Sequence, residues 1–249
     1  MSSAGNLSER NPVFGPRGKL GIVVPANNSV IEPEFWSALP KGVALYGTRI
    51  MARGDLTPDA VRLMETQVDR AVDELSATGV DVIAYADMVT TFIMEPGWNE
   101  HAVESISRKT GVACVSAWTS LRDALSTLDV RSFALGTPYP ASIHALAPPF
   151  FEARGFRLTG HATLDIIAMR DVPKVDPELL RDFVRSLARD GAQAVVLLAT
   201  DLPTFACLEA LEADCGCPVL SSNQVILWAA LRAMGVPDRL SGLGALFQR

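Results

Sequence analysis

The chain has 249 residues, of which 49% are hydrophobic, which is enough for one large domain or for two smaller ones. The net charge of −6 and the lack of a long Lys/Arg cluster argue against a nucleic-acid-binding surface. No apolar run reaches the roughly 18 residues of a membrane span, so no contact with a membrane is expected.

In chain order, residues 1–18 are rich in Ser, Asn, Pro and Gly and lack the apolar core of a signal peptide, which predicts a flexible N-terminal tail. A first half then spans residues 19–130. Its short apolar runs predict strands at 20–24, 43–50, 82–86 and 113–116. Its helix-start signals and apolar spacing predict a short helix from 32–36 and longer ones at 57–77, 100–110 and 119–128.

A second half spans residues 131–249 and repeats this alternation. Strands are expected at 133–137, 158–164, 195–199 and 219–221, and helices at about 141–154, 176–191, 204–213 and 225–234. Strands that alternate with helices form mainly parallel sheets with helices on both faces. The predicted fold is therefore α/β with two pseudo-symmetric halves, an active site in the cleft between them, and a final helix that crosses back to the other half.

Similar stretches in the two halves strengthen this prediction. Pro25 and Pro138 each end an apolar run, and they lie 113 residues apart. The same offset places Asp87 opposite Thr200, at the ends of two further apolar runs. The stretches that begin at Gly111 and Gly216 repeat the order with an offset of 105. Asp87 and Thr200 are thus expected at equivalent places of the two halves.

Asp87 is the first candidate site residue. It follows an apolar strand, and ligands of α/β sheets bind beyond the carboxyl ends of such strands. One interpretation is a general base or acid with a raised pKa, and the other is a helix N-cap. Thr200 and Asp201 offer a hydroxyl and a carboxylate at the matching place, or a helix start before Pro203.

The loops after the first strand of each half carry Asn28 and Tyr139, whose amide and phenol suit a carboxylate or an oxyanion, although Asn28 could be a helix cap and Tyr139 a packing residue. Weaker candidates at the other strand ends are Ser116, Ser221, Ser222 and Asn223. Cys207 is interpreted as a core residue rather than a nucleophile.

Cofactor and metal motifs are absent. No glycine-rich nucleotide fingerprint follows a strand, and the three histidines lack ligand spacing, so we expect neither a cofactor nor a metal. The four cysteines, Cys114, Cys207, Cys215 and Cys217, form no C-x-x-C pair, and Cys215 and Cys217 are too close for ordinary disulfide geometry, although a strained disulfide stays open. This predicts free thiols in a cytoplasmic protein.

Several segments resemble the aspartate/glutamate racemase superfamily, in the branch of maleate cis-trans isomerases and arylmalonate decarboxylases. The segments that carry the likeness are 20–34 (LGIVVPANNSVIEPE), 98–100 (WNE), 136–139 (GTPY) and 218–222 (PVLSS). The resemblance implies two α/β halves with the site in the cleft between them, and substrate binding by Asn28 and Tyr139. The two catalytic positions of the family, commonly cysteines, fall on Asp87 and Thr200.

This departure bears on the reaction, because racemisation and thiolate addition need thiols. We therefore expect a cofactor-independent enzyme acting on a small carboxylate. Asp87 is the expected general base for water in hydrolysis of a small lactone, amide or related derivative, and Thr200 the expected partner that orients the water or binds the oxyanion. The substrate-binding groups would be Asn28, Tyr139 and Asp201, together with backbone N–H groups at Met88, Val89 and Leu202.

Two alternatives stay open. One is a decarboxylase, cis-trans isomerase or racemase of a small carboxylate, with Asp87 or Tyr139 as proton donor. The other is a small-acid-binding protein without catalysis. A homodimer or homotetramer is compatible with the apolar helices.

Overall fold

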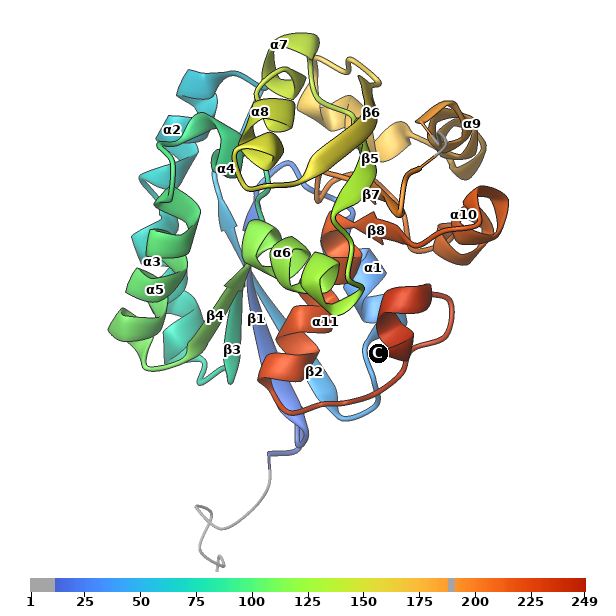
Figure 1. Ribbon diagram of the computed structural model, residues 1–249. Helices are drawn as coiled ribbons and strands as arrows, with labels where there is room; N and C mark the ends of the chain where they lie inside the picture. Colours follow the sequence, from blue (N-terminus) through green and yellow to red (C-terminus); the bar gives the residue numbers. More distant parts are fainter. Residues whose placement is uncertain (1–11, 188–190) are drawn as a thin grey trace, which may run out of the picture.

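The computed structural model describes residues 12–187 and 191–249, so most of the predicted tail at 1–18 lies outside the described residues (Figure 1). The first half contains a four-stranded parallel sheet in the order β2-β1-β3-β4. Its strands are β1 (Gly18–Pro25), β2 (Val43–Ile50), β3 (Val82–Tyr85) and β4 (Ala113–Ser116).

The second half contains a second parallel sheet in the matching order β6-β5-β7-β8. Its strands are β5 (Ser132–Thr137), β6 (Arg157–Thr163), β7 (Ala194–Leu197) and β8 (Val219–Ser221). The first and third strands of each half are the two central ones, so β1 and β3 correspond to β5 and β7. The prediction of an α/β fold with two pseudo-symmetric halves is confirmed.

The helices of the first half follow the predicted order, with one break. They are α1 (Ile31–Ala38), α2 (Pro58–Glu65), α3 (Val68–Ala77), α4 (Thr90–Ile93), α5 (Trp98–Thr110) and α6 (Ala117–Thr127). The helix expected over 57–77 is in fact two helices, α2 and α3. At the break, the side chain of Gln67 accepts a hydrogen bond from the N–H of Met51 at 2.9 Å. This hydrogen bond to the loop after β2 accompanies the break between α2 and α3. The spacing of apolar residues reports only local structure and does not predict it.

The helical segments of the second half are α7 (Ala141–His144), α8 (Ala147–Glu152), η2 (Met169–Lys174), α9 (Pro177–Leu187), α10 (Leu208–Cys215), α11 (Ser222–Ala233) and η3 (Ala245–Gln248). The helix expected from residue 204 begins only at Leu208, because the Glu34 carboxylate accepts the N–H groups of Thr204 and Phe205. The helix expected from residue 225 begins at Ser222, because the Ser221 hydroxyl accepts the N–H of Gln224 as an N-cap.

Helices α6 and α11 lie in the middle of the molecule between the two sheets (Figure 1). Although α11 comes from the end of the chain, it packs against β3 and β4 of the first sheet. Helices α3 and α5 pack against the first sheet from the side away from α11, and α9 and α10 flank the second sheet (Figure 1). The core is therefore continuous across the two halves.

An aromatic cluster adds to this continuity. Its members come from α4, α6, β5, α8 and the loop before β6: Phe92, Trp118, Phe133, Phe150, Phe151 and Phe156. The ring centroids of Trp118 and Phe150 are 4.8 Å apart in an edge-to-face arrangement. Edge-to-face pairs stabilise beyond the apolar area they bury.

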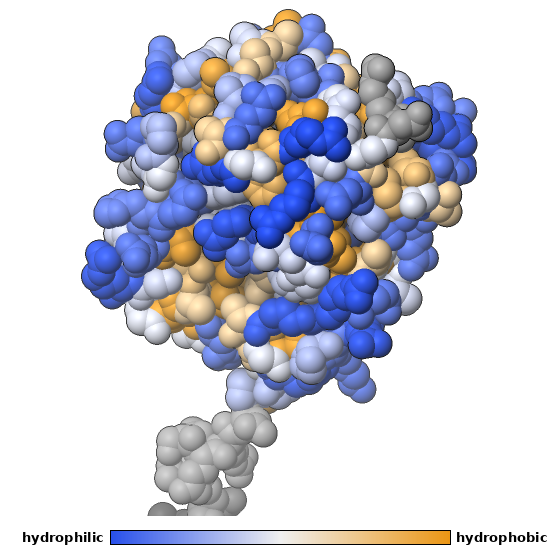
Figure 2. Space-filling view, viewed as in Figure 1, coloured by the Kyte–Doolittle hydropathy of each residue, from blue (hydrophilic) through white to orange (hydrophobic). Residues whose placement is uncertain are grey.

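Hydrophilic side chains interspersed with small apolar patches cover the face of the molecule seen in Figure 2. Within residues 12–187 and 191–249, no helix combines the length and the apolar character needed to cross a membrane.

Candidate active site

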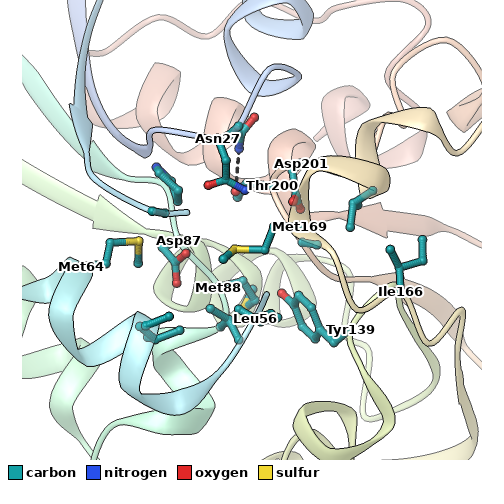
Figure 3. Close-up of a pocket in the computed structure, with 18 residues that line it drawn as sticks. Asn27, Leu56, Met64, Asp87, Met88, Tyr139, Ile166, Met169, Thr200 and Asp201 are labelled. Atoms are coloured by element: carbon teal, nitrogen blue, oxygen red, sulfur yellow. Dashed lines mark hydrogen bonds between the residues drawn. The ribbon is translucent and has the colours of Figure 1, made fainter. Parts of the chain in front are cut away.

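The carboxyl ends of the central strands converge on a cavity between the two halves (Figure 3). Its volume is about 50 Å³, which is room for a few water molecules or part of a small organic acid. Pro25 ends β1, Asp87 follows β3, Tyr139 follows β5 and Thr200 follows β7, and all four line the cavity. Parallel strands explain this convergence, since their carboxyl ends lie at one edge of each sheet.

Asp87 is buried, with 6% of its surface exposed, and it lies on the cavity wall (Figure 3). Its Oδ1 atom accepts the N–H of Thr90 at 2.8 Å, at the start of α4. Burial raises the pKa of Asp87, and hydrogen bonds from Thr90 and Val89 offset only part of this effect. The Asp87 carboxyl group thus binds the first turn of α4 and favours its protonated form more than an exposed aspartate does.

The Thr200 hydroxyl connects the two halves next to Asp87. It donates to the carbonyl oxygen of Ala86 at 3.1 Å and accepts from the Nδ2 atom of Asn28 at 3.0 Å. The Oδ1 atom of Asn28 in turn accepts the N–H groups of Val30 and Ile31 at the start of α1. Because its only hydrogen is already donated, Thr200 acts here as a fixed polar bridge rather than as an acid.

The backbone immediately before Thr200 is held in an uncommon conformation. Ala199 has a φ of +95°, in the region that favours glycine. Its N–H donates to the hydroxyl of Ser222 at 3.1 Å. Strain of this kind costs of order 1–3 kcal/mol and is concentrated at functional sites.

Asp201 and Tyr139 complete the polar lining (Figure 3). Asp201 is half-buried and lines the cavity, and burial together with the charge of Asp87 raises its pKa to about 7. Burial and the same two carboxylates raise the pKa of Tyr139 well above its ordinary value. Tyr139 therefore stays a neutral hydrogen-bond donor, and Asp201 is a donor whenever it is protonated.

The rest of the wall is apolar and was not foreseen from the sequence. It is formed by side chains of α2, the loops that follow β2 and β6, and η2: Ala52, Leu56, Ala60, Val61, Met64, Ile166, Met169 and Val172. Asn27 also lines the cavity, and its buried Oδ1 atom has no hydrogen-bond partner among the described residues. The loops after β2 and β6 lie at the same sheet edges as the loops that carry Asp87 and Tyr139. This position is the signal that could have revealed their apolar lining residues.

The structure brings most of the predicted site residues together. Besides the five polar residues above, Met88 and Val89 line the cavity. Leu202 does not: it is fully buried in the core and is not among the lining residues, because the chain turns away into the segment that Glu34 anchors. Leu202 is therefore placed outside the cavity lining, and the role of its backbone N–H in substrate binding stays a prediction.

The weaker candidates serve the fold. Ser116 and Ser221 cap α6 and α11. Asn223 donates to Glu34 and to the carbonyl oxygen of Thr200, and thereby fixes the cavity wall from behind. Cys207 is buried outside the cavity lining, and its thiol donates to the carbonyl oxygen of Thr204 at 3.3 Å. Burial raises the pKa of Cys207 to about 11, which makes a thiolate unfavourable.

The cavity lining contains no Lys, Arg or His among the described residues. In the same part of the chain, no three His, Cys, Asp or Glu side chains are grouped so that they could hold a metal ion. A bound anion must therefore be held by neutral donors, by backbone N–H groups and by the protons of the two aspartates.

Comparison with known proteins gives consistent results. The sequence model of the arylmalonate decarboxylase family matches residues 20–247. A maleate isomerase of Geobacillus stearothermophilus is 26% identical over 241 residues, which cover 92% of this chain and 96% of that protein. An arylmalonate decarboxylase of Bordetella bronchiseptica is 26% identical over 229 residues, which cover 90% and 91%.

A solved structure gives the same picture in three dimensions. The Nocardia farcinica maleate cis-trans isomerase, in a cysteine-to-serine mutant with a covalently bound succinylcysteine intermediate, superposes with a TM-score of 0.87 at 26% identity. The match covers 92% of this chain and 98% of that one. The predicted resemblance to this branch is confirmed.

Proposed function

Since the chain belongs to the arylmalonate decarboxylase family, we propose that it is a cofactor-independent decarboxylase of a small malonate-type acid, with Asp87 as the proton donor. The relatives are enzymes that isomerise or decarboxylate small acids. The observation that carries the proposal is a buried carboxyl group with a raised pKa, at a cavity whose described lining has an apolar wall and no thiol.

The chemistry balances with the groups present. The bond between the central carbon and one carboxylate breaks, CO₂ leaves, and the electron pair stays with the remaining carboxyl group as an enediolate. The proton of Asp87 then moves to the central carbon. The apolar wall favours this direction, because an ionic carboxylate in a site without water gives way to neutral CO₂. In this proposal Tyr139, which lines the cavity, donates a hydrogen bond to the enediolate oxygen.

Isomerisation by covalent addition is less suited to this site. The Nocardia farcinica isomerase carries its intermediate on a cysteine. The described lining here has no cysteine, and burial raises the pKa of Cys114 to about 12 and of Cys207 to about 11. A carboxylate adds poorly to a double bond. Hydrolysis, with Asp87 as base, stays a prediction that the relatives do not support, since a raised pKa favours the acid form of Asp87.

Labelled solvents test the proposal. The protein is incubated with methylmalonate, phenylmalonate, maleate and a set of small lactones and amides, in D₂O and separately in H₂¹⁸O. We expect CO₂ from a malonate, one deuterium on the product carbon, and no ¹⁸O in the product acid. Release of a product that carries ¹⁸O without CO₂ would establish a hydrolase instead. Conversion of maleate to fumarate without CO₂ would establish an isomerase.

The pH dependence of KM gives a separate prediction. Asp201, with a pKa of about 7, is a neutral donor below that pH and a negative charge facing the substrate above it. Since the described lining offers no cation, KM for a malonate should rise about tenfold per pH unit above this pKa. Asp201→Asn should flatten this rise, because the amide is a donor at every pH.

Steady-state kinetics of the two proteins between neutral and alkaline pH checks this, with the exposed Asp59→Asn as control. A wild-type KM that does not change with pH, or an Asp201→Asn variant with the wild-type dependence, would contradict it.

A further inference from the structure

Three further polar residues, Thr90, Tyr85 and Glu65, lie near Asp87 where the end of α2 meets the start of α4. The Tyr85 hydroxyl, at the end of β3, donates a hydrogen bond to the Oε1 atom of Glu65, the last residue of α2. Tyr85 is fully enclosed, while Glu65 is only partly buried. We propose that Glu65 takes protons from solvent and passes them, through the hydroxyls of Tyr85 and Thr90, to Asp87. The proposal rests on the proposed role of Asp87 as an acid.

Thr90 lies next to Asp87, because its backbone N–H donates to the Oδ1 atom of Asp87 at 2.8 Å. Its side chain is fully buried, and its hydroxyl has no hydrogen-bond partner among the described residues. It nevertheless lies close enough to the carboxyl group of Asp87 and to the hydroxyl of Tyr85 to lower the pKa of both. A buried hydroxyl without a fixed partner is unusual. Rotation of the Thr90 hydroxyl can connect Tyr85 with Asp87.

The reaction creates the need for such a connection. Each decarboxylation consumes one proton, so Asp87 is left ionised after every turnover. Asp87 is buried at a cavity that the product still occupies at that moment. Bulk water therefore reaches Asp87 poorly from the cavity side, and a route through the protein lets it regain its proton.

Glu65 has the properties of an entry point. Burial raises the pKa of Glu65 to about 8, and the charge of Asp87 adds to this effect. A group with a pKa near neutrality exchanges protons with solvent in both directions. When Glu65 is protonated, its O–H donates to Tyr85, Tyr85 donates to Thr90, and Thr90 donates to Asp87. One proton enters at Glu65 and one arrives at Asp87, so the transfer balances.

Among the described residues, no cation pairs with Glu65, so its carboxyl group can take up and hold a proton. The titratable groups that face it are Tyr85 and Asp87, and the ring of Trp98 packs edge-on against Tyr85 at 5.9 Å. Among the described ion pairs, none includes Glu65, and Arg62 on the same helix pairs with Asp59. Glu65 is thus a positioning residue. It supplies protons to Asp87 and acts on the substrate only through Asp87.

Glu65→Gln and Tyr85→Phe test the route, with Asp59→Asn on the same helix as the matched control. The probe is the malonate that the enzyme decarboxylates. Both variants should lose about tenfold or more in kcat with kcat/KM unchanged, so that KM falls in parallel, because regaining the proton follows the loss of CO₂ and becomes limiting. As the pH is raised, kcat of the variants should begin to fall at a lower pH than kcat of the wild type. Added imidazole should restore kcat of the variants, since a small acid can deliver the proton instead. Asp59→Asn should behave as wild type.

Wild-type kcat and pH profile in both variants would overturn the proposal. So would folded variants whose lost activity imidazole does not restore, because that result indicates a structural role. If one variant fails to fold, the other decides, and Thr90→Val gives a third break in the same route. Asp87→Asn separates the two proposals: if it is inactive while Glu65→Gln and Tyr85→Phe are normal, only the route is wrong. If Asp87→Asn is fully active, the proposed function is wrong as well.

Discussion

Replacing Asp87 with Asn should lower kcat by about 10²–10⁴-fold, the usual loss when a general acid is removed. The reason for this loss is that the variant lacks the proton that Asp87 transfers, while the local structure is kept. The amide oxygen of Asn can still accept the N–H of Thr90, which Asp87 accepts at 2.8 Å, so the turn into α4 is kept. The amide cannot deliver a proton to the product carbon. KM should therefore change little, and the pattern is that of a group needed in the transition state.

The measurement is steady-state decarboxylation together with thermal unfolding of each variant. Asp176→Asn is the matched control, because Asp176 accepts the N–H of Leu179 at the same distance of 2.8 Å but lies outside the cavity lining. If the two variants turn over equally well, Asp87 is a cap and nothing more.

Trp118→Ala should lower the free energy of unfolding by about 3–5 kcal/mol, the range measured for buried aromatic residues. Trp118 is 1% exposed and is the largest fully buried side chain. It packs edge-on against Phe150 and Phe151, and the guanidinium of Arg154 lies 5.3 Å from its ring centroid. Its indole N–H donates to Glu100 at 2.7 Å. Truncation would leave a cavity between α6 and α8, which belong to different halves.

Equilibrium unfolding in urea checks this value. Trp36, with 62% of its surface exposed, is the matched control, and Trp36→Ala should change the stability by no more than about 0.5 kcal/mol. Equal losses in the two variants would mean that the aromatic cluster does not hold the halves together.

The sequence carried enough information for the fold because apolar runs and turn signals are local. The offset of 113 residues between the halves predicted that Asp87 and Thr200 would occupy equivalent places, and both lie on the same cavity. The four-residue strands β3 and β7 needed no distant contact to be identified.

What the sequence could not supply depends on contacts between distant segments. Thr200 bonds to Ala86, which is 114 residues away, and this bond decides that Thr200 is a bridge rather than an acid. The apolar wall combines α2 with η2, and neither segment carries a motif. The position of Leu202 outside the cavity lining depends on Glu34, far away in the sequence, which binds the N–H groups of Thr204 and Phe205.

The bond from Thr200 to Ala86 also bears on the handedness of the product. An enediolate that carries a substituent is flat, and a proton can reach its central carbon from either face. In a site with two equivalent acids, both faces would be served. Here the hydroxyl hydrogen of Thr200 is already bound to the carbonyl oxygen of Ala86, and Asp87 occupies the other matching place. Delivery from one side alone would turn a malonate with two different substituents into a single mirror-image form of the acid.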